Sequence, residues 1–137
     1  MLQIEKNKTC CFITDDSEKY TASLDDVREY LEKQIVKAME EEKTCFISGM
    51  SNQIDMWISS IILELKVKYK ELKLICAIPY FGYEKQMDLF QKCLYRCIIS
   101  DADKVFYISE EDNNSSLELK DKWMIEHSSK IIKIKLP

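Results

Sequence analysis

Glycine, proline and histidine are scarce in this sequence, which has two, two and one of them among its 137 residues. The two glycines, Gly49 and Gly82, lie far apart, so no glycine-rich phosphate-binding loop can form from them. A histidine-based catalytic triad would depend on His127 alone, and His127 falls at a predicted helix end where a capping role is expected. We therefore assign no catalytic residue.

The sequence also lacks a long apolar stretch and an excess of positive charge. No run reaches the roughly 18 apolar residues that a membrane span requires, and no apolar signal segment follows the first methionine. The net charge of −4 provides no field that would gather nucleic acid or an anionic membrane. We expect a cytoplasmic protein with neither a membrane nor nucleic acid as its partner.

The six cysteines contain no C-x-x-C pair. Cys10 and Cys11 are neighbours on a predicted strand, whereas Cys93 and Cys97 share the face of a predicted helix. The spacing of a structural zinc site is therefore absent, and we expect no metal and no cofactor. In the cytosol the six thiols should be reduced, and most of them should be buried as small apolar side chains.

Short apolar runs alternate along the chain with stretches whose apolar residues recur every three or four positions. The runs are typical of strands buried on both faces, and the longer stretches are typical of helices with one buried face. The predicted strands are residues 9–13, 44–48, 72–78, 105–108 and 131–134. The predicted helices are residues 24–39, 54–69, 84–99 and 117–127.

This alternation predicts an α/β fold, a Rossmann-like three-layer α/β/α sandwich with a mostly parallel five-stranded sheet. Right-handed crossovers place helices on both faces of such a sheet. The length and apolar content fit one domain over residues 1–137. In folds of this kind ligands bind beyond the carboxyl ends of the strands, so we look for functional residues there.

The segment after the second predicted strand is the first candidate. Gly49 follows the strand and Ser51 or Asn52 can cap the next helix, whose free N–H groups can receive an anion. Two interpretations of Gly49 stay open, close approach of a ligand or a tight turn alone. Asp55 could accept a hydrogen bond from a sugar hydroxyl or base, or only support the helix start. Trp57 could stack on a base or belong to the core.

The loop after the third predicted strand is the second candidate. Pro79 is expected to close that strand, and Tyr80, Gly82 and Tyr83 follow it. Proline, glycine and tyrosine are typical of a rigid rim around a cleft. A surface loop whose aromatic side chains cover the end of the sheet is the equally open alternative.

Five segments appear in the order and spacing of a known family: KTCCF, FISGM with DMW, LELK with LKLICAIP, ISDADKV and WMIEHS. On these motifs the chain resembles the YpsA-like branch of the SLOG superfamily, over nearly its whole length. The resemblance implies a Rossmann-like domain that binds nucleotides or nucleotide-derived molecules. The family's S-G-M, D-x-W and I-P motifs correspond to Ser48, Gly49, Met50, Asp55, Trp57 and Pro79.

The chain departs from the family pattern at three places. The family's T-G-H-R-P loop is replaced by Ile13, Thr14, Asp15, Asp16 and Ser17, so an acid stands where an arginine is expected. The R-N-x-x-M-V-D-x-S pattern of the fourth helix becomes Lys120, Asp121, Met124, Ile125, Glu126 and Ser128. We also expect the family's G-G-T turn after the fifth strand to be missing, and no phosphoribohydrolase P-G-G-x-G-T motif is present.

Our leading hypothesis is non-enzymatic binding of a nucleotide-derived small molecule, as a sensor or sequestering protein in bacterial or phage conflict. The candidate ligand-binding residues are Thr14, Asp15, Ser48, Gly49, Met50, Asp55, Trp57, Pro79, Tyr80, Lys120 and Glu126. One alternative is a protein-interaction scaffold with a decayed site, which a cleft filled by its own side chains would favour. Another is a nucleotide hydrolase with Asp55 or Glu126 as general base. We also expect a homodimer, because the fifth strand lies near an exposed edge.

Overall fold

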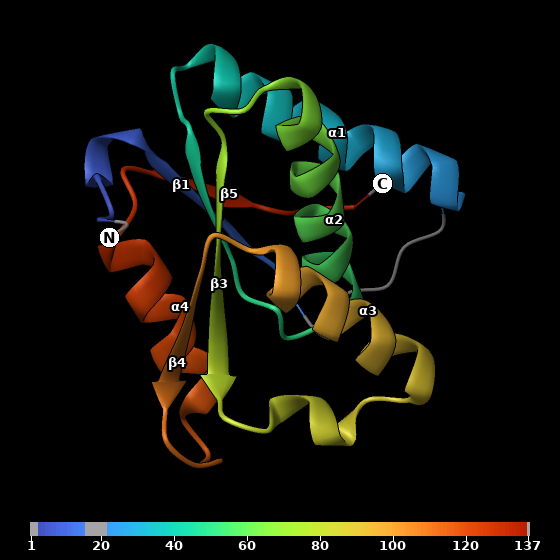
Figure 1. Cartoon of the computed structure of the whole chain (residues 1–137), viewed down its shortest axis with the longest axis vertical. Helices are drawn as coiled ribbons and strands as arrows, with labels where there is room; N and C mark the ends of the chain where they lie inside the picture. Colours follow the sequence, from blue (N-terminus) through green and yellow to red (C-terminus); the bar gives the residue numbers. More distant parts are fainter. Residues whose placement is uncertain (1–2, 16–21, 137) are drawn as a thin grey trace.

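The computed structural model describes residues 3–15 and 22–136, and within them the chain forms one parallel sheet with helices on both faces (Figure 1). The strand order is β4-β3-β2-β1-β5, and every pairing is parallel. The strands are β1 Thr9–Ile13, β2 Cys45–Ser48, β3 Lys73–Tyr80, β4 Lys104–Ser109 and β5 Lys130–Lys133. The helices are α1 Leu24–Glu40, α2 Gln53–Lys68, α3 Leu89–Asp101 and α4 Ser116–Glu126, with short 3-10 turns η1 Lys6–Lys8 and η2 Tyr83–Gln86. The predicted Rossmann-like α/β fold is confirmed.

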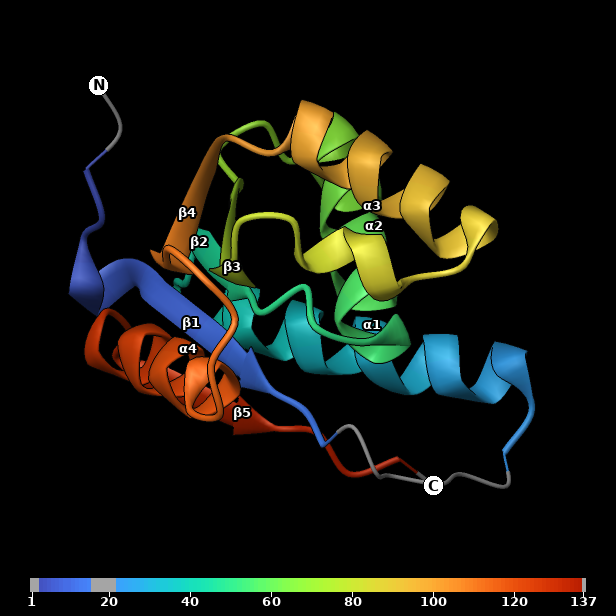
Figure 2. The ribbon, with the colours of Figure 1, turned by 90° about the horizontal axis from the view of Figure 1, so that it is seen from below.

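The two faces of the sheet are covered unequally (Figure 2). Helices α1, α2 and α3 lie over one face, where Phe12, Phe46 and Leu31 belong to the larger core cluster. Helix α4 lies over the other face, where Cys11, Ile47 and Met124 belong to a smaller one. Successive strand residues point to opposite faces, so the neighbours Cys10 and Cys11 enter different clusters. No described helix is long and apolar enough to cross a membrane.

The chain changes direction across the sheet at β1. Strands β1 to β4 follow one another outward in chain order, and the chain then returns through α4 to place β5 on the free side of β1. β1 and β5 pair from Cys10 with Lys130 to Ile13 with Lys133. The crevice between β1 and β5 is therefore the topological switch point, where open α/β sheets bind their ligands.

Two predicted boundaries around the third strand are wrong. Pro79 does not close β3 but lies inside it, beyond the point where β3 pairs with β2, so its missing N–H interrupts no β2–β3 pairing. The helix predicted over residues 84–99 is two elements, η2 and α3. Helix α3 begins late because Asp88 accepts a hydrogen bond from Gln91 N at 2.8 Å in a capping box.

All six cysteines are free thiols, and they fall into two groups. Cys10, Cys11, Cys45 and Cys76 are buried in the sheet, as predicted for most of the cysteines. Burial raises the pKa of the Cys10 and Cys76 thiols to about 12. Cys93 and Cys97 on α3 are exposed instead, which the sequence analysis did not anticipate.

Candidate functional site

Six polar side chains converge at the carboxyl ends of β1 and β2. They come from the residue after β1, from the end of β2 and the start of α2, and from α4 on the opposite face of the sheet. We call this group the Asp55 cluster: Thr14, Ser48, Ser51, Asn52, Asp55 and Lys120. Four of the other five are hydrogen-bonded to the Asp55 side chain or main chain, and Lys120 is hydrogen-bonded to Ser51, so Asp55 lies at the centre.

The Asp55 carboxylate is 1% exposed and accepts hydrogen bonds on both oxygens. Oδ1 accepts from Thr14 Oγ1 at 2.9 Å, and Oδ2 accepts from Ser51 N at 2.9 Å and Ser51 Oγ at 2.8 Å. Asn52 is the N-cap of α2: its Oδ1 accepts from Asp55 N at 2.8 Å, and its Nδ2 donates to Thr14 Oγ1 at 2.8 Å. Asp55 thus fixes Thr14 and Ser51 in place around the helix start.

Lys120 reaches the same turn from α4 and is 4% exposed. Its Nζ donates to Ser51 Oγ at 3.0 Å and forms an ion pair with Asp121 Oδ1 at 3.0 Å. The Ser51 hydroxyl in turn donates to Asp55 Oδ2, so one serine links the buried cation to the buried anion. From the sequence, Ser51 is expected only as a candidate cap, because its contact with Lys120 joins residues 69 positions apart.

Gly49 makes room for the Asp55 cluster. A Cβ at this position would lie 2.6 Å from Lys120 Nζ and 3.3 Å from Asp55 Oδ2. The left-handed backbone in this turn belongs to Met50, at φ 50°, and not to Gly49. Met50 is fully buried, and Ser59 Oγ donates to its sulfur at 3.4 Å. The space beside Gly49 is occupied by the protein's own side chains.

The loop after β3 closes one side of the Asp55 cluster. Tyr83 Oη donates to the Ser51 carbonyl at 2.8 Å, and the Tyr80 ring meets the Tyr83 ring edge-on at 5.3 Å between centroids. Pro79 is buried within β3. Tyr80 and Pro79 therefore support the rim predicted for this loop, while the contact with the site comes from Tyr83.

Two candidate residues lie away from the Asp55 cluster. Trp57 lines a groove of about 220 Å³ between α1 and α2, with Leu24 and Ile61 among its neighbours. Glu126 is exposed at the last residue of α4, close to where the chain enters β5. That end of α4 lies at the amino edge of the sheet, because the next residues approach the start of β1 through Ser129 N and Thr9 O.

A depression of about 380 Å³ lies at the switch point between β1 and β5. Ile13, Thr14 and Asp15 line it at and beyond the end of β1, and Lys133, Ile134 and Lys135 line it at and beyond the end of β5. In the sequence, Lys130, Lys133 and Lys135 are typical of the polar side of an edge strand, so they gave no signal of a binding site. Asp16 and Ser17, which belong to the same departure from the family pattern, lie outside the described residues.

Chemically, the described residues present hydroxyl, carboxylate and ammonium groups at this edge. No three His, Cys, Asp or Glu side chains gather as a metal site within residues 3–15 and 22–136. Thr14 belongs both to the Asp55 cluster and to the depression, so it joins the two. The arrangement can donate and accept hydrogen bonds and can pair with an anion.

Comparison with known proteins places the chain in a family. It is 27% identical to a UPF0398 protein of Brevibacillus brevis over 108 residues, which is 77% of this chain and 57% of the relative. It is equally identical to UPF0398 proteins of Ligilactobacillus salivarius and Bacillus anthracis, covering 58% and 60% of those chains. The chain thus spans about three fifths of the relatives' length. The model of the YspA SLOG family (YpsA) matches residues 8–134, and the chain belongs to this family.

Proposed function

We propose that this domain binds a nucleotide-derived small molecule at the β1/β5 switch point, without catalysing its conversion. The observation that carries the proposal is the position of Thr14, which lines the depression and is held by the Asp55 cluster. Ligands of open α/β sheets bind at this place in the topology. Family membership supports a Rossmann-like domain of this kind.

The depression offers complementary groups for the parts of a nucleotide. Lys133 and Lys135 are exposed cations that can pair with a phosphate group. Asp15 is an exposed carboxylate that can accept hydrogen bonds from sugar hydroxyls. Asp55, by contrast, is surrounded by hydrogen-bond donors of its own chain, so in this proposal it positions Thr14 and does not touch the ligand.

The Asp55 cluster supports binding on energetic grounds. Burying a carboxylate and an ammonium costs several kcal/mol each, and apolar replacements of buried ion pairs are often neutral or stabilising. Asp55 and Lys120 are buried at 1% and 4% exposure, and Ser51 Oγ links them. A buried charge arrangement is weak evidence for a purely stabilising role, and it fits a role in organising a site.

A protein-interaction scaffold is the second candidate, and one observation favours it. The backbone at Gly49, where a ligand would approach most closely, is covered by Lys120 Nζ and Asp55 Oδ2. A site filled by its own side chains is expected where an ancestral pocket no longer takes a ligand. The two candidates differ in one measurable property, the binding of a small molecule to the purified domain.

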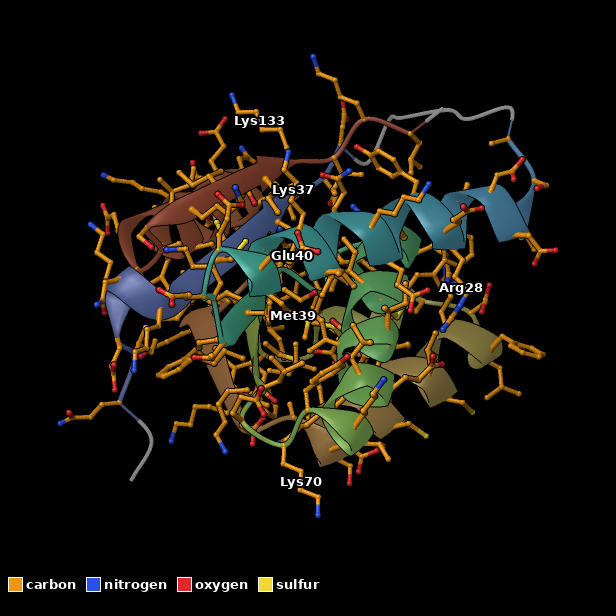
Figure 3. The ribbon with its side chains drawn as sticks, turned by 90° about the horizontal axis from the view of Figure 1, so that it is seen from above. Arg28, Lys37, Met39, Glu40, Lys70 and Lys133 are labelled. Atoms are coloured by element: carbon orange, nitrogen blue, oxygen red, sulfur yellow. The ribbon has the colours of Figure 1, made fainter. Side chains whose placement is uncertain are left out.

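Calorimetric titration with AMP, ADP and ADP-ribose tests the proposal. Replacing Lys133 and Lys135 by glutamine should weaken binding about 10-fold or more, since one hydrogen bond to a charged group contributes about 1.5–3 kcal/mol. Lys70→Gln is the matched control: Lys70 is exposed and lies on the opposite side of the molecule from Lys133 (Figure 3). Binding should be unchanged in that variant.

A second pair of variants tests Thr14. Thr14→Val removes the hydroxyl at nearly constant shape and should weaken binding. Thr44→Val should not, because Thr44 directly precedes β2 and so lies at the amino edge of the sheet, away from the depression. Absence of any heat of binding in the wild type would contradict the proposal and favour the scaffold. Equal weakening by the control variants would place the ligand elsewhere.

A further inference from the structure

Two exposed cysteines lie one helical turn apart on α3. Cys93 and Cys97 are both free and exposed, and residues four apart face the same side of a helix. The remaining cysteines, Cys10, Cys11, Cys45 and Cys76, are buried in the sheet. Cys93 and Cys97 are therefore the thiols of this chain that a reagent in solution can reach.

The spacing allows both sulfurs to hold one atom. Side chains at positions i and i+4 have Cβ atoms about 5–6 Å apart. Two bonds of about 2.3 Å to one soft ion require the sulfurs to lie within about 4.6 Å of each other. Rotation about the Cα–Cβ bonds of Cys93 and Cys97 can bring the sulfurs into this range without moving the helix.

The surroundings of the pair select the kind of ion. Between Leu89 and Ser100, α3 carries no carboxylate, and its charged residues are Lys92 and Arg96. Oxygen ligands attract hard cations such as magnesium and calcium, whereas thiolates select soft ones. The face around Cys93 and Cys97 offers sulfur and two positive charges, so hard cations gain nothing there.

We propose that Cys93 and Cys97 form a dithiol site that binds soft, thiophilic ions through both sulfurs, with trivalent arsenic as the type case. An aryl arsenoxide reacts by losing its oxygen as water: two S–H bonds break, two As–S bonds form, and no atom is oxidised or reduced. The buried thiols do not compete, because burial removes them from solvent and raises the pKa of Cys10 and Cys76 to about 12. The site is independent of the carboxyl edge of the sheet.

Intact-mass spectrometry of the native protein with phenylarsine oxide tests this site. The wild type should take up one phenylarsenic unit, which a dithiol such as 2,3-dimercaptopropanol removes and a monothiol does not. Cys93→Ser and Cys97→Ser should each weaken uptake by about 100-fold or more. In the wild type the second As–S bond forms within one molecule, at a high effective concentration of the second thiol, and either substitution removes this bond. Both positions are on the surface, so the fold should persist, as circular dichroism can verify.

A matched variant separates chelation from thiol exposure alone. Combining Cys97→Ser with Ser100→Cys keeps two exposed thiols on α3 but moves them seven residues, about 10 Å, apart. Alkylation of the folded proteins should modify two thiols in each, whereas only the wild type should bind one arsenical tightly. Equal affinity in the moved-cysteine variant would overturn the proposal, as would no arsenical uptake by a wild type in which alkylation shows both thiols to be reactive.

Discussion

At the scale of single residues, Ser51 joins three elements that are distant in the sequence. Its hydroxyl accepts from Lys120 of α4 and donates to Asp55 of α2, and its carbonyl accepts from Tyr83 of η2. Ser51 follows Met50, whose left-handed backbone is uncommon for a residue with a side chain. The unfavourable conformation persists because hydrogen bonds on both sides of the turn determine it.

The space beside Gly49 leads to a first prediction. Gly49→Ala should push Lys120 Nζ out of its buried position, since the new Cβ would lie 2.6 Å from it. Loss of the hydrogen bond to Ser51 should lower the free energy of unfolding by about 1–3 kcal/mol in urea denaturation. In a Lys120→Ala background the same change should cost clearly less, because the ammonium is gone. Additive costs of the two substitutions would contradict this account.

At the scale of elements, Asp103 ties α2 and β3 to the turn before β4. Burial alone would raise the pKa of its carboxyl, but Lys66 Nζ at 2.5 Å, Leu74 N at 2.8 Å and the charge of Lys73 together hold that pKa below its ordinary value of 3.8. A carboxylate with a lowered pKa stabilises the fold above its unfolded pKa. This contribution is lost as the pH falls through the lowered value.

Asp103→Asn should therefore lower the free energy of unfolding at pH 7 and make that free energy less dependent on pH in the acid range. We expect a loss of about 1–3 kcal/mol at pH 7, and a smaller further loss than in the wild type between about pH 5 and pH 2. Asp101→Asn serves as the control, because Asp101 is exposed at the last residue of α3. Parallel pH profiles for wild type and Asp103→Asn, measured by urea titration, would exclude this role.

Element boundaries were predictable from sequence where apolar periodicity and capping residues agree. Ser23, a capping residue type directly before the helix predicted over residues 24–39, accepts a hydrogen bond from Asp26 N, and the strands follow their apolar runs. The start of α3 was missed because Met87 extends the apolar pattern into η2, while the Asp88 cap decides where the helix begins. The end of β3 was predicted wrongly because a proline is tolerated inside a strand where no paired strand needs its N–H. Whether this holds at Pro79 depends on which strands pair with β3 there.

The candidate site was predictable only in its local part. Ser48, Gly49 and Asp55 share one strand–turn–helix segment, so sequence spacing alone brings them together. The roles of Tyr83 and Lys133 depend on the path of a loop and on the order of strands, which spacing does not encode. Trp57 lies two residues from Asp55 and so faces another side of α2, and Glu126 lies at the far end of α4 from the Asp55 cluster.

At the scale of the whole molecule, the sheet has two edges, and homodimerisation stays a prediction. β5 has four residues and includes Lys130 and Lys133, and lysines discourage edge pairing. β4 has six residues, and its exposed Tyr107 packs against Phe81 at 5.3 Å between ring centroids. The β4 edge is therefore the better surface for a second copy.

We expect Tyr107→Glu to abolish association and Ile131→Glu to leave it intact. Both side chains are exposed and largely apolar. Tyr107 lies on the β4 edge and Ile131 on the β5 edge, so each substitution tests one edge of the sheet. Sedimentation velocity over a range of concentrations measures the outcome. A wild-type monomer at high concentration would refute the dimer, and loss of association only in Ile131→Glu would assign it to β5.

The position of β5 also sets an order of assembly. Every pairing among β1 to β4 joins strands that are consecutive in the sequence. The pairing of β1 with β5 instead joins Cys10 to Lys130, across almost the whole chain. Contacts between residues so distant form slowly, because the intervening chain must be ordered first. During synthesis on the ribosome the first four strands can assemble while one side of β1 is still open. The crevice at the switch point is thus the last part of the sheet to come into existence.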